Sequence, residues 1–126
     1  MSLGKIKTKS IYDSKETSDG IRILVTRYWP RGKKKSEFDL WLKSLSPPRN
    51  TIALYKKGEF DVSKMAADYD QHINSHITKD MLNDIQSILD MLKSGTTVTL
   101  LCYEREGEFC HRHLLKSHLE SKLLDQ

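Results

Sequence analysis

The fold is indicated most clearly by Thr96-Thr97-Val98-Thr99-Leu100-Leu101-Cys102-Tyr103-Glu104, which a short loop separates from Cys110-His111-Arg112. The first segment is rich in Thr, Val and Leu, a composition typical of a buried strand. The second opens a stretch, through residue 123, in which Leu114, Leu115 and Leu119 recur at helical spacing. A strand followed directly by a helix is typical of a sheet covered by helices.

Two further strands are expected before this segment, at residues 5–12 and 21–27, separated by a polar loop. The apolar run in the second is nearly continuous rather than alternating, as in a strand covered on both faces. The eight-residue loop leaves open whether the two strands form a hairpin or are joined by a short crossover.

Between these strands and the last one, the sequence predicts four helices. They are a short amphipathic helix within residues 38–45 ended by Pro47-Pro48, a second at residues 52–56, a third starting at Asp61, and a fourth capped by Thr78 and ended by Gly95. Strands and helices in this order imply right-handed βαβ connectivity. We therefore predict one compact three-layer α/β domain over residues 1–126, with a small, mainly parallel sheet flanked by helices. A chain of this length with 37% hydrophobic residues can form such a core.

Composition narrows the function classes. No apolar run is long enough to span a bilayer, and the first residues lack the basic-then-apolar pattern of a signal peptide, so we expect a cytoplasmic protein without a membrane partner. Two cysteines do not make a disulfide framework. The net charge of +4 is compatible with a phosphate-bearing partner but does not identify one.

A candidate site lies where the second and last strands end. If they are parallel neighbours, their carboxyl ends bring Arg27-Tyr28-Trp29-Pro30-Arg31 beside Cys102, Glu104 and the helix start at Cys110. Ligands bind outside the carboxyl ends of strands in open α/β sheets. A helix start adds unpaired backbone N–H groups that favour anions. We expect a basic, aromatic and thiol-bearing cleft that binds an anion.

Cys110, His111 and Glu104 are the catalytic candidates. A thiol at a helix N-terminus beside His111 and Arg112 is expected to have a lowered pKa and to act as a nucleophile, whereas the alternative is a small buried apolar residue. His111 suits a general base, a metal ligand, a partner that polarises Cys110, or only a helix cap. Glu104 suits an acid/base group, a partner of Arg112, or an acceptor for a ribose hydroxyl.

The ligand-binding candidates come from both strand ends and the helix start: Arg27, Trp29, Arg31, Cys102 and Arg112. Arg31 and Arg112 suit bidentate capture of phosphate, and the alternative is a structural ion pair with an acid such as Glu104. Trp29, flanked by arginines, suits stacking on a base or closing the edge of the core. Cys102 lies inside the apolar run and is expected to belong to the core.

A zinc site was weighed because Cys102, Cys110, His111 and Glu104 supply four possible ligands. The spacing contains no paired Cys-x-x-Cys, and ligands at adjacent positions are geometrically awkward, so we expect no metal and no cofactor. Only His111 separates Cys110 from Arg112, which is too short for the phosphate loop of a cysteine phosphatase. No glycine-rich nucleotide loop is present.

Two segments are distinctive enough to suggest a family, namely Trp29-Pro30-Arg31-Gly32 within residues 19–32 and Cys110-His111-Arg112. Together with residues 41–47 and 99–104, they resemble domain-of-unknown-function family 488 (DUF488), in its short YeaO-like branch. The resemblance covers almost the whole chain and implies a compact three-layer α/β architecture, without an established reaction. Thr26 departs from relatives, which tend to carry an acidic residue there, so the resemblance implies no acid/base role at that position.

Two functional hypotheses follow. The first is an enzyme that acts on a phosphorylated small molecule or nucleotide, with Cys110 or Glu104 reactive and the arginines holding the anion. The second is a non-catalytic module that binds nucleotide or nucleic acid in the same cleft. The sequence does not indicate an oligomeric state.

Overall fold

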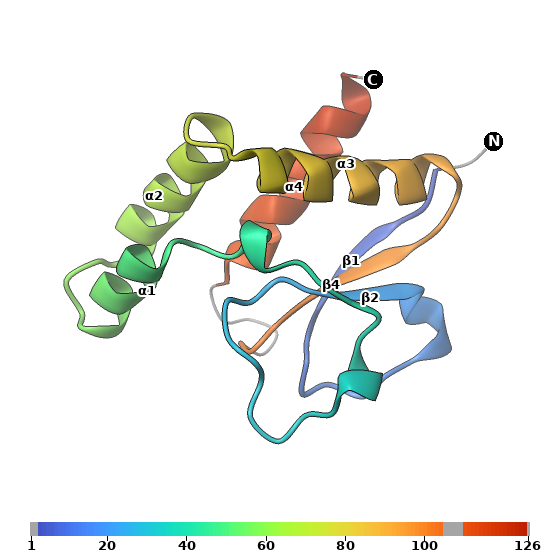
Figure 1. Ribbon diagram of the computed structural model, residues 1–126, viewed down its shortest axis with the longest axis horizontal. Helices are drawn as coiled ribbons and strands as arrows, with labels where there is room; N and C mark the ends of the chain where they lie inside the picture. Colours follow the sequence, from blue (N-terminus) through green and yellow to red (C-terminus); the bar gives the residue numbers. More distant parts are fainter. Residues whose placement is uncertain (1–2, 105–109, 126) are drawn as a thin grey trace.

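The computed structural model describes residues 3–104 and 110–125 and contains a four-stranded parallel sheet (Figure 1). The strands are β1 (Ile6–Ser10), β2 (Ile21–Leu24), β3 (Leu40–Trp41) and β4 (Val98–Cys102), in the spatial order β1-β4-β2-β3. Both β1 and β2 pair in parallel with β4. The first two strands are therefore not a hairpin, because β4 lies between them.

The turn into β2 requires a glycine. Gly20 has a φ of 65°, and a Cβ at this position would lie 2.1 Å from the carbonyl oxygen of Thr97. The Ile21 N–H donates to that same carbonyl at 2.9 Å. Close backbone approach at Gly20 therefore sets where β2 begins to pair with β4.

The described residues form four α-helices: α1 (Arg49–Lys56), α2 (Val62–Asn74), α3 (Lys79–Lys93) and α4 (His111–Leu124). Residues of α2, α3 and α4 pack in the core on one face of the sheet, and α1 lies beside α2 (Figure 1). Asp61 and Thr78 cap α2 and α3 by accepting hydrogen bonds from the N–H groups of Lys64 and Met81. The sequence predicts the cap at Thr78 and the start of a helix at Asp61. None of the helices in the described ranges is both long and apolar enough to cross a lipid bilayer.

Alternation along β4 divides the core between two faces. Val98, Leu100 and Cys102 pack with residues of α3 and α4 on one face. Leu101 lies on the other face, in a smaller cluster of buried apolar residues with Ile11, Leu24 and Phe38. This second face is closed by the 3₁₀ turns η1 (Thr17–Asp19) and η2 (Lys35–Glu37) and their loops. The predicted compact α/β domain with a small parallel sheet is confirmed.

A buried ion network also lies on the second face. The Asp19 carboxylate is fully buried and accepts from the Arg22 guanidinium at 2.5 Å, from Lys9 at 3.1 Å and from Lys7 at 3.3 Å. Buried charges of this kind are tolerated when they are paired and hydrogen-bonded. The network fixes the loop before β2 against β1.

The helix predicted within residues 38–45 is wrong. This segment forms β3, paired with Ile23 and Leu24 of β2, and then the 3₁₀ turn η3 (Lys43–Leu45). Leu40 packs on the helix-covered face and Trp41 on the opposite one, which is the alternation of an extended chain. The apolar residues had suggested a helical stripe, but pairing with a distant strand determines the conformation.

Candidate functional site

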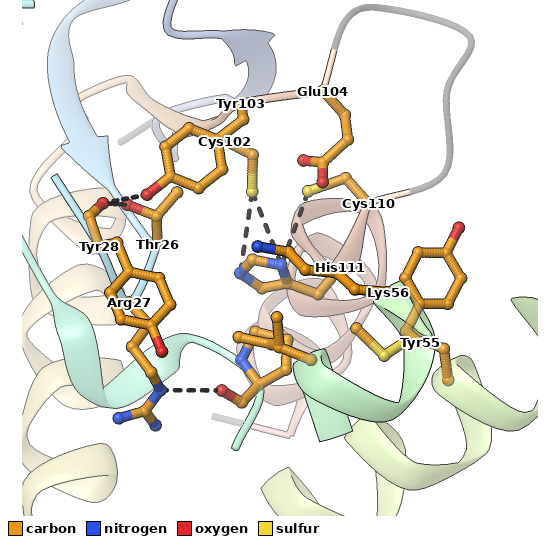
Figure 2. Close-up of a pocket in the computed structure, with 13 residues that line it drawn as sticks. Thr26, Arg27, Tyr28, Tyr55, Lys56, Cys102, Tyr103, Glu104, Cys110 and His111 are labelled. Atoms are coloured by element: carbon orange, nitrogen blue, oxygen red, sulfur yellow. Dashed lines mark hydrogen bonds between the residues drawn. The ribbon is translucent and has the colours of Figure 1, made fainter. Parts of the chain in front are cut away.

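A pocket of about 280 Å³ opens at the carboxyl ends of β2 and β4. It is lined by Thr26, Arg27, Tyr28, Pro47, Ile52, Tyr55, Lys56, Met65, Cys102, Tyr103, Glu104, Cys110 and His111. Figure 2 shows the imidazole and both thiols together, with Arg27 and Tyr28 on one side and Tyr55 and Lys56 on the other. The parallel sheet thus brings residues from distant parts of the sequence to one edge, as predicted.

His111, the first residue of α4, is held in a defined orientation. Its Nε2 lies 2.7 Å from the carbonyl oxygen of Val25, and since a carbonyl only accepts, Nε2 carries a proton. In the neutral imidazole Nδ1 then has a lone pair. This atom lies 3.7 Å from the Sγ of Cys102 and 3.6 Å from the Sγ of Cys110. The ring packs edge-on against Tyr69, with 5.2 Å between centroids.

The two cysteines reach His111 from different elements. Cys102 ends β4 and is fully buried. Cys110 is the N-cap residue of α4, and its Sγ accepts from the N–H of Arg112 at 3.5 Å. Both thiols and Nδ1 face one another, within 4.8 Å.

The expected lowering of the Cys110 pKa is wrong. Burial is the largest influence and raises the pKa of this thiol far above its ordinary value, with the Cys102 thiol adding to the effect and His111 opposing it. The side chain is 3% exposed. The helix start does not compensate, because removal from water disfavours the thiolate more strongly.

Arg112 does not line the pocket, contrary to the expectation that it holds an anion there. The side chain is fully buried and donates from Nη1 to the backbone carbonyl of Glu104 at 2.7 Å. A guanidinium in this position ties the start of α4 to the end of β4. The carboxylate of Glu104 lies on the pocket lining, as predicted.

Trp29 and Arg31 also lie outside the pocket lining. Trp29 packs edge-on against Phe38 and Trp41, with centroids 5.3 and 5.4 Å away, and its Nε1 donates to the carbonyl of Lys33. Arg31 is exposed. Trp29 therefore packs with the smaller cluster on the second face of the sheet and not beside the thiols.

Arg27 is the arginine that the structure does place on the pocket wall, where its Nε donates to the carbonyl of Pro47 at 3.3 Å. The sequence did not single out Tyr28, Tyr55, Lys56 or Tyr103. Tyr28 and Tyr103 adjoin predicted site residues, and that adjacency was the available signal. Tyr55 and Lys56 lie on α1, and no local pattern indicated where that helix would pack.

The rim of the pocket is ordered by a shared acceptor. The backbone carbonyl of Tyr28 accepts hydrogen bonds from the hydroxyls of Thr26, at 2.8 Å, and of Tyr103. Burial raises the pKa of Tyr103, although these neighbours partly counteract the shift. The ends of β2 and β4 are thereby connected above the thiols.

These features define a class, namely parallel α/β proteins with a pocket at the carboxyl edge of the sheet. A family model described as DUF488-N3a, "Active DUF488-N3 subclade", matches residues 6–123. The chain therefore belongs to this family. Over 44 residues it is 52% identical to the uncharacterized protein YeaO of Escherichia coli K12, a segment that covers 33% of this chain and 38% of YeaO. Both findings confirm the predicted DUF488 and YeaO-like assignment. No solved structure matches the chain with significance.

Proposed function

We propose that this protein is an enzyme that acts on a phosphate-bearing small molecule or nucleotide bound in the pocket at the carboxyl edge of the sheet. The observation that carries the proposal is the combination of two cations, Arg27 and Lys56, with three tyrosines around a pocket of about 280 Å³. Ligand pockets are mostly apolar and aromatic, with a few polar groups that fix orientation.

The two cations and the aromatic rings suit different parts of such a ligand. Arg27 is half-buried, and its bond to the Pro47 carbonyl fixes the guanidinium plane at the wall. A guanidinium held in this way binds phosphate oxygens with defined geometry. Lys56 adds a second positive charge. Tyr28, Tyr55 and Tyr103 offer ring faces for an apolar or heterocyclic part of the ligand.

Catalysis is supported by the group at the floor of the pocket. The Nδ1 of His111 has a lone pair and lies 3.6 Å from the Sγ of Cys110, so that it can accept a proton. Glu104 adds a carboxylate to the lining. The description of the matched family model as an active subclade supports the same conclusion.

One observation favours the alternative, a non-catalytic module that binds nucleotide. Burial raises the Cys110 pKa, and a protonated thiol is a poor nucleophile. The binding residues are the same in both functions, so the alternative differs only in whether the ligand is changed.

Binding is tested by calorimetric titration with AMP, adenosine and inorganic phosphate. AMP should bind at least roughly tenfold more tightly than adenosine, since a charge-assisted hydrogen bond contributes about 1.5–3 kcal/mol. Added salt should weaken AMP binding. Arg27→Gln and Lys56→Gln should reduce the affinity, whereas Arg31→Gln and Lys57→Gln, at exposed positions outside the lining, should not. Equal losses in the controls would place the anion site elsewhere.

Turnover is tested by incubating phosphorylated ligands with the protein and following them by phosphorus NMR and mass spectrometry. Product formation that is lost in His111→Gln supports the enzyme. Recovery of every bound ligand unchanged, both by the protein as purified and after divalent metal is added, supports the binding module.

A further inference from the structure

We infer that Cys102, Cys110 and His111 form a zinc site with a fourth coordination position open to the pocket. The two Sγ atoms and the Nδ1 atom of these residues lie within 4.8 Å of one another at the floor of the pocket (Figure 2), and the inference is based on this proximity. The inference is independent of the proposed ligand, because it uses none of the residues assigned to anion binding, but it replaces the proton-accepting role proposed for the Nδ1 of His111 with metal coordination.

The separations between the ligand atoms fit tetrahedral zinc. With Zn–S near 2.3 Å and Zn–N near 2.0–2.1 Å, tetrahedral geometry puts sulfur and nitrogen ligands about 3.6 Å apart. The observed distances from Nδ1 are 3.7 Å to the Sγ of Cys102 and 3.6 Å to the Sγ of Cys110. Cys110 already has this placement, but the Sγ of Cys102 also lies 3.8 Å from Nε2, beside the ring and not along the Nδ1 lone pair. The Cys102 side chain therefore has to turn for one ion to contact all three atoms.

The imidazole is already in the tautomer that a metal requires. Nε2 donates to the Val25 carbonyl at 2.7 Å, so the lone pair of the neutral ring is on Nδ1, which lies 3.6 Å from the Sγ of Cys110. Metal-bound histidines commonly donate their other N–H to a backbone carbonyl or carboxylate, which fixes the ring orientation. Val25 supplies this partner directly after β2.

The backbone explains how adjacent residues can serve as ligands, which the sequence had suggested was awkward. Cys110 is extended, with φ of −154° and ψ of 145°, and His111 is the first helical residue. The change of backbone conformation between them turns both side chains to the same side. Cys102, arriving from β4, completes the triangle.

Charge and ligand type favour zinc over magnesium or calcium. Thiolates and imidazole prefer zinc, whereas magnesium and calcium prefer oxygen ligands. Two thiolates and a neutral imidazole with one divalent ion have zero net charge, which suits a buried group. Coordination also deprotonates a thiol that burial would otherwise keep neutral.

Three protein ligands would leave the fourth coordination position of a zinc ion free for water or substrate. The carboxylate of Glu104 is not part of the three-residue group within the described chain, although it lines the same pocket. Two cysteines and one histidine, with a water or substrate atom in the fourth position, is a catalytic zinc arrangement, as in alcohol dehydrogenase. A ligand atom in the pocket would occupy this position.

The inference is tested by titrating the reduced, metal-free protein with cobalt(II) and then with zinc. One cobalt per chain should give tetrahedral visible bands and a thiolate charge-transfer band, and zinc should displace it. X-ray absorption of the zinc form should show two sulfurs at about 2.3 Å and a nitrogen near 2.0–2.1 Å. A coordination shell without sulfur, or no uptake, overturns the inference.

Matched variants assign the ligands. Serine is a preferred N-cap residue, so Cys110→Ser should keep α4 intact while removing one thiolate. Loss of a second-shell partner alone weakens metal binding by 10–100-fold, so losing this ligand should weaken zinc by at least about 100-fold. His76→Gln, at an exposed position, should bind cobalt as the parent does. A full charge-transfer band in Cys110→Ser refutes the site.

Arg27→Gln separates this inference from the proposed function. It should bind cobalt normally while losing affinity for AMP. Should a variant fail to fold by circular dichroism, the absorption spectra of the parent protein still decide the question.

Discussion

Replacing Arg112 with alanine should destabilise the protein by about 3–5 kcal/mol. The side chain is fully buried and donates to the Glu104 carbonyl at 2.7 Å. Its removal loses a hydrogen bond from a charged group to the half-buried Glu104 carbonyl, worth about 1.5–3 kcal/mol, and buried methylenes worth about 0.8 kcal/mol each. For a domain of this size the melting temperature should fall by roughly 10–20 °C. Thermal melts and urea denaturation measure both quantities.

Glu104→Gln is the matched comparison. Because the observed bond uses the backbone carbonyl of Glu104, neutralising the carboxylate should change the free energy of unfolding by less than about 1 kcal/mol. If Arg112→Ala melts like the parent, the guanidinium does not hold α4 to β4 and the reasoning is refuted. An equally large loss in Glu104→Gln would show that the carboxylate, and not the carbonyl, carries the interaction.

Three further outcomes are expected. Burial acts to raise the pKa of Asp19, but hydrogen bonds, first from the Glu16 N–H and then from two lysines and an arginine, lower it from 3.8 to about 2. Because this pKa is lower in the folded protein than in the unfolded chain, ionised Asp19 stabilises the fold by about 2 kcal/mol above about pH 4, and this contribution is lost as the pH falls through 2. The free energy of unfolding of the parent, measured across this pH range, should show the loss, and that of Asp19→Asn should not. Cys110 should react slowly with iodoacetamide at neutral pH, because burial raises its pKa, and rapid labelling seen by mass spectrometry would contradict this. Leu89→Ala should cost about 2–5 kcal/mol in urea denaturation, since the side chain is 1% exposed in the core under α3.

The helices that could be predicted are those with local signals. Asp61 and Thr78 cap their helices, and the starts of α2, α3 and α4 follow from caps and apolar spacing that act within a few residues. The helix predicted within residues 38–45 was wrong because Leu40 and Trp41 are extended through their pairing with β2, which no local pattern indicates. The open question about the first two strands depended in the same way on β4 entering between them.

For the candidate site, the sequence predicted which segments meet but not how deeply each side chain is buried. Cys102, Glu104, Cys110, His111 and Arg27 share one pocket because parallel strands end at one edge. The direction of the Cys110 pKa shift and the position of Arg112 were wrong, since both depend on packing by neighbours distant in the sequence. Tyr55 and Lys56 of α1 were missed for the same reason, because only tertiary packing brings this helix to the pocket.

Burial connects the two proposals through the thiols. Burial raises the pKa of the Cys110 thiol, and the Nδ1 of His111, 3.6 Å from its sulfur, can accept only one proton. A zinc ion would bind both sulfurs as thiolates at the floor of the pocket that Arg27 also lines. A metal-free preparation would then bind an anionic ligand without changing it, and would be mistaken for the non-catalytic module. Metal content therefore has to be determined first, because it decides whether an absence of turnover argues against catalysis.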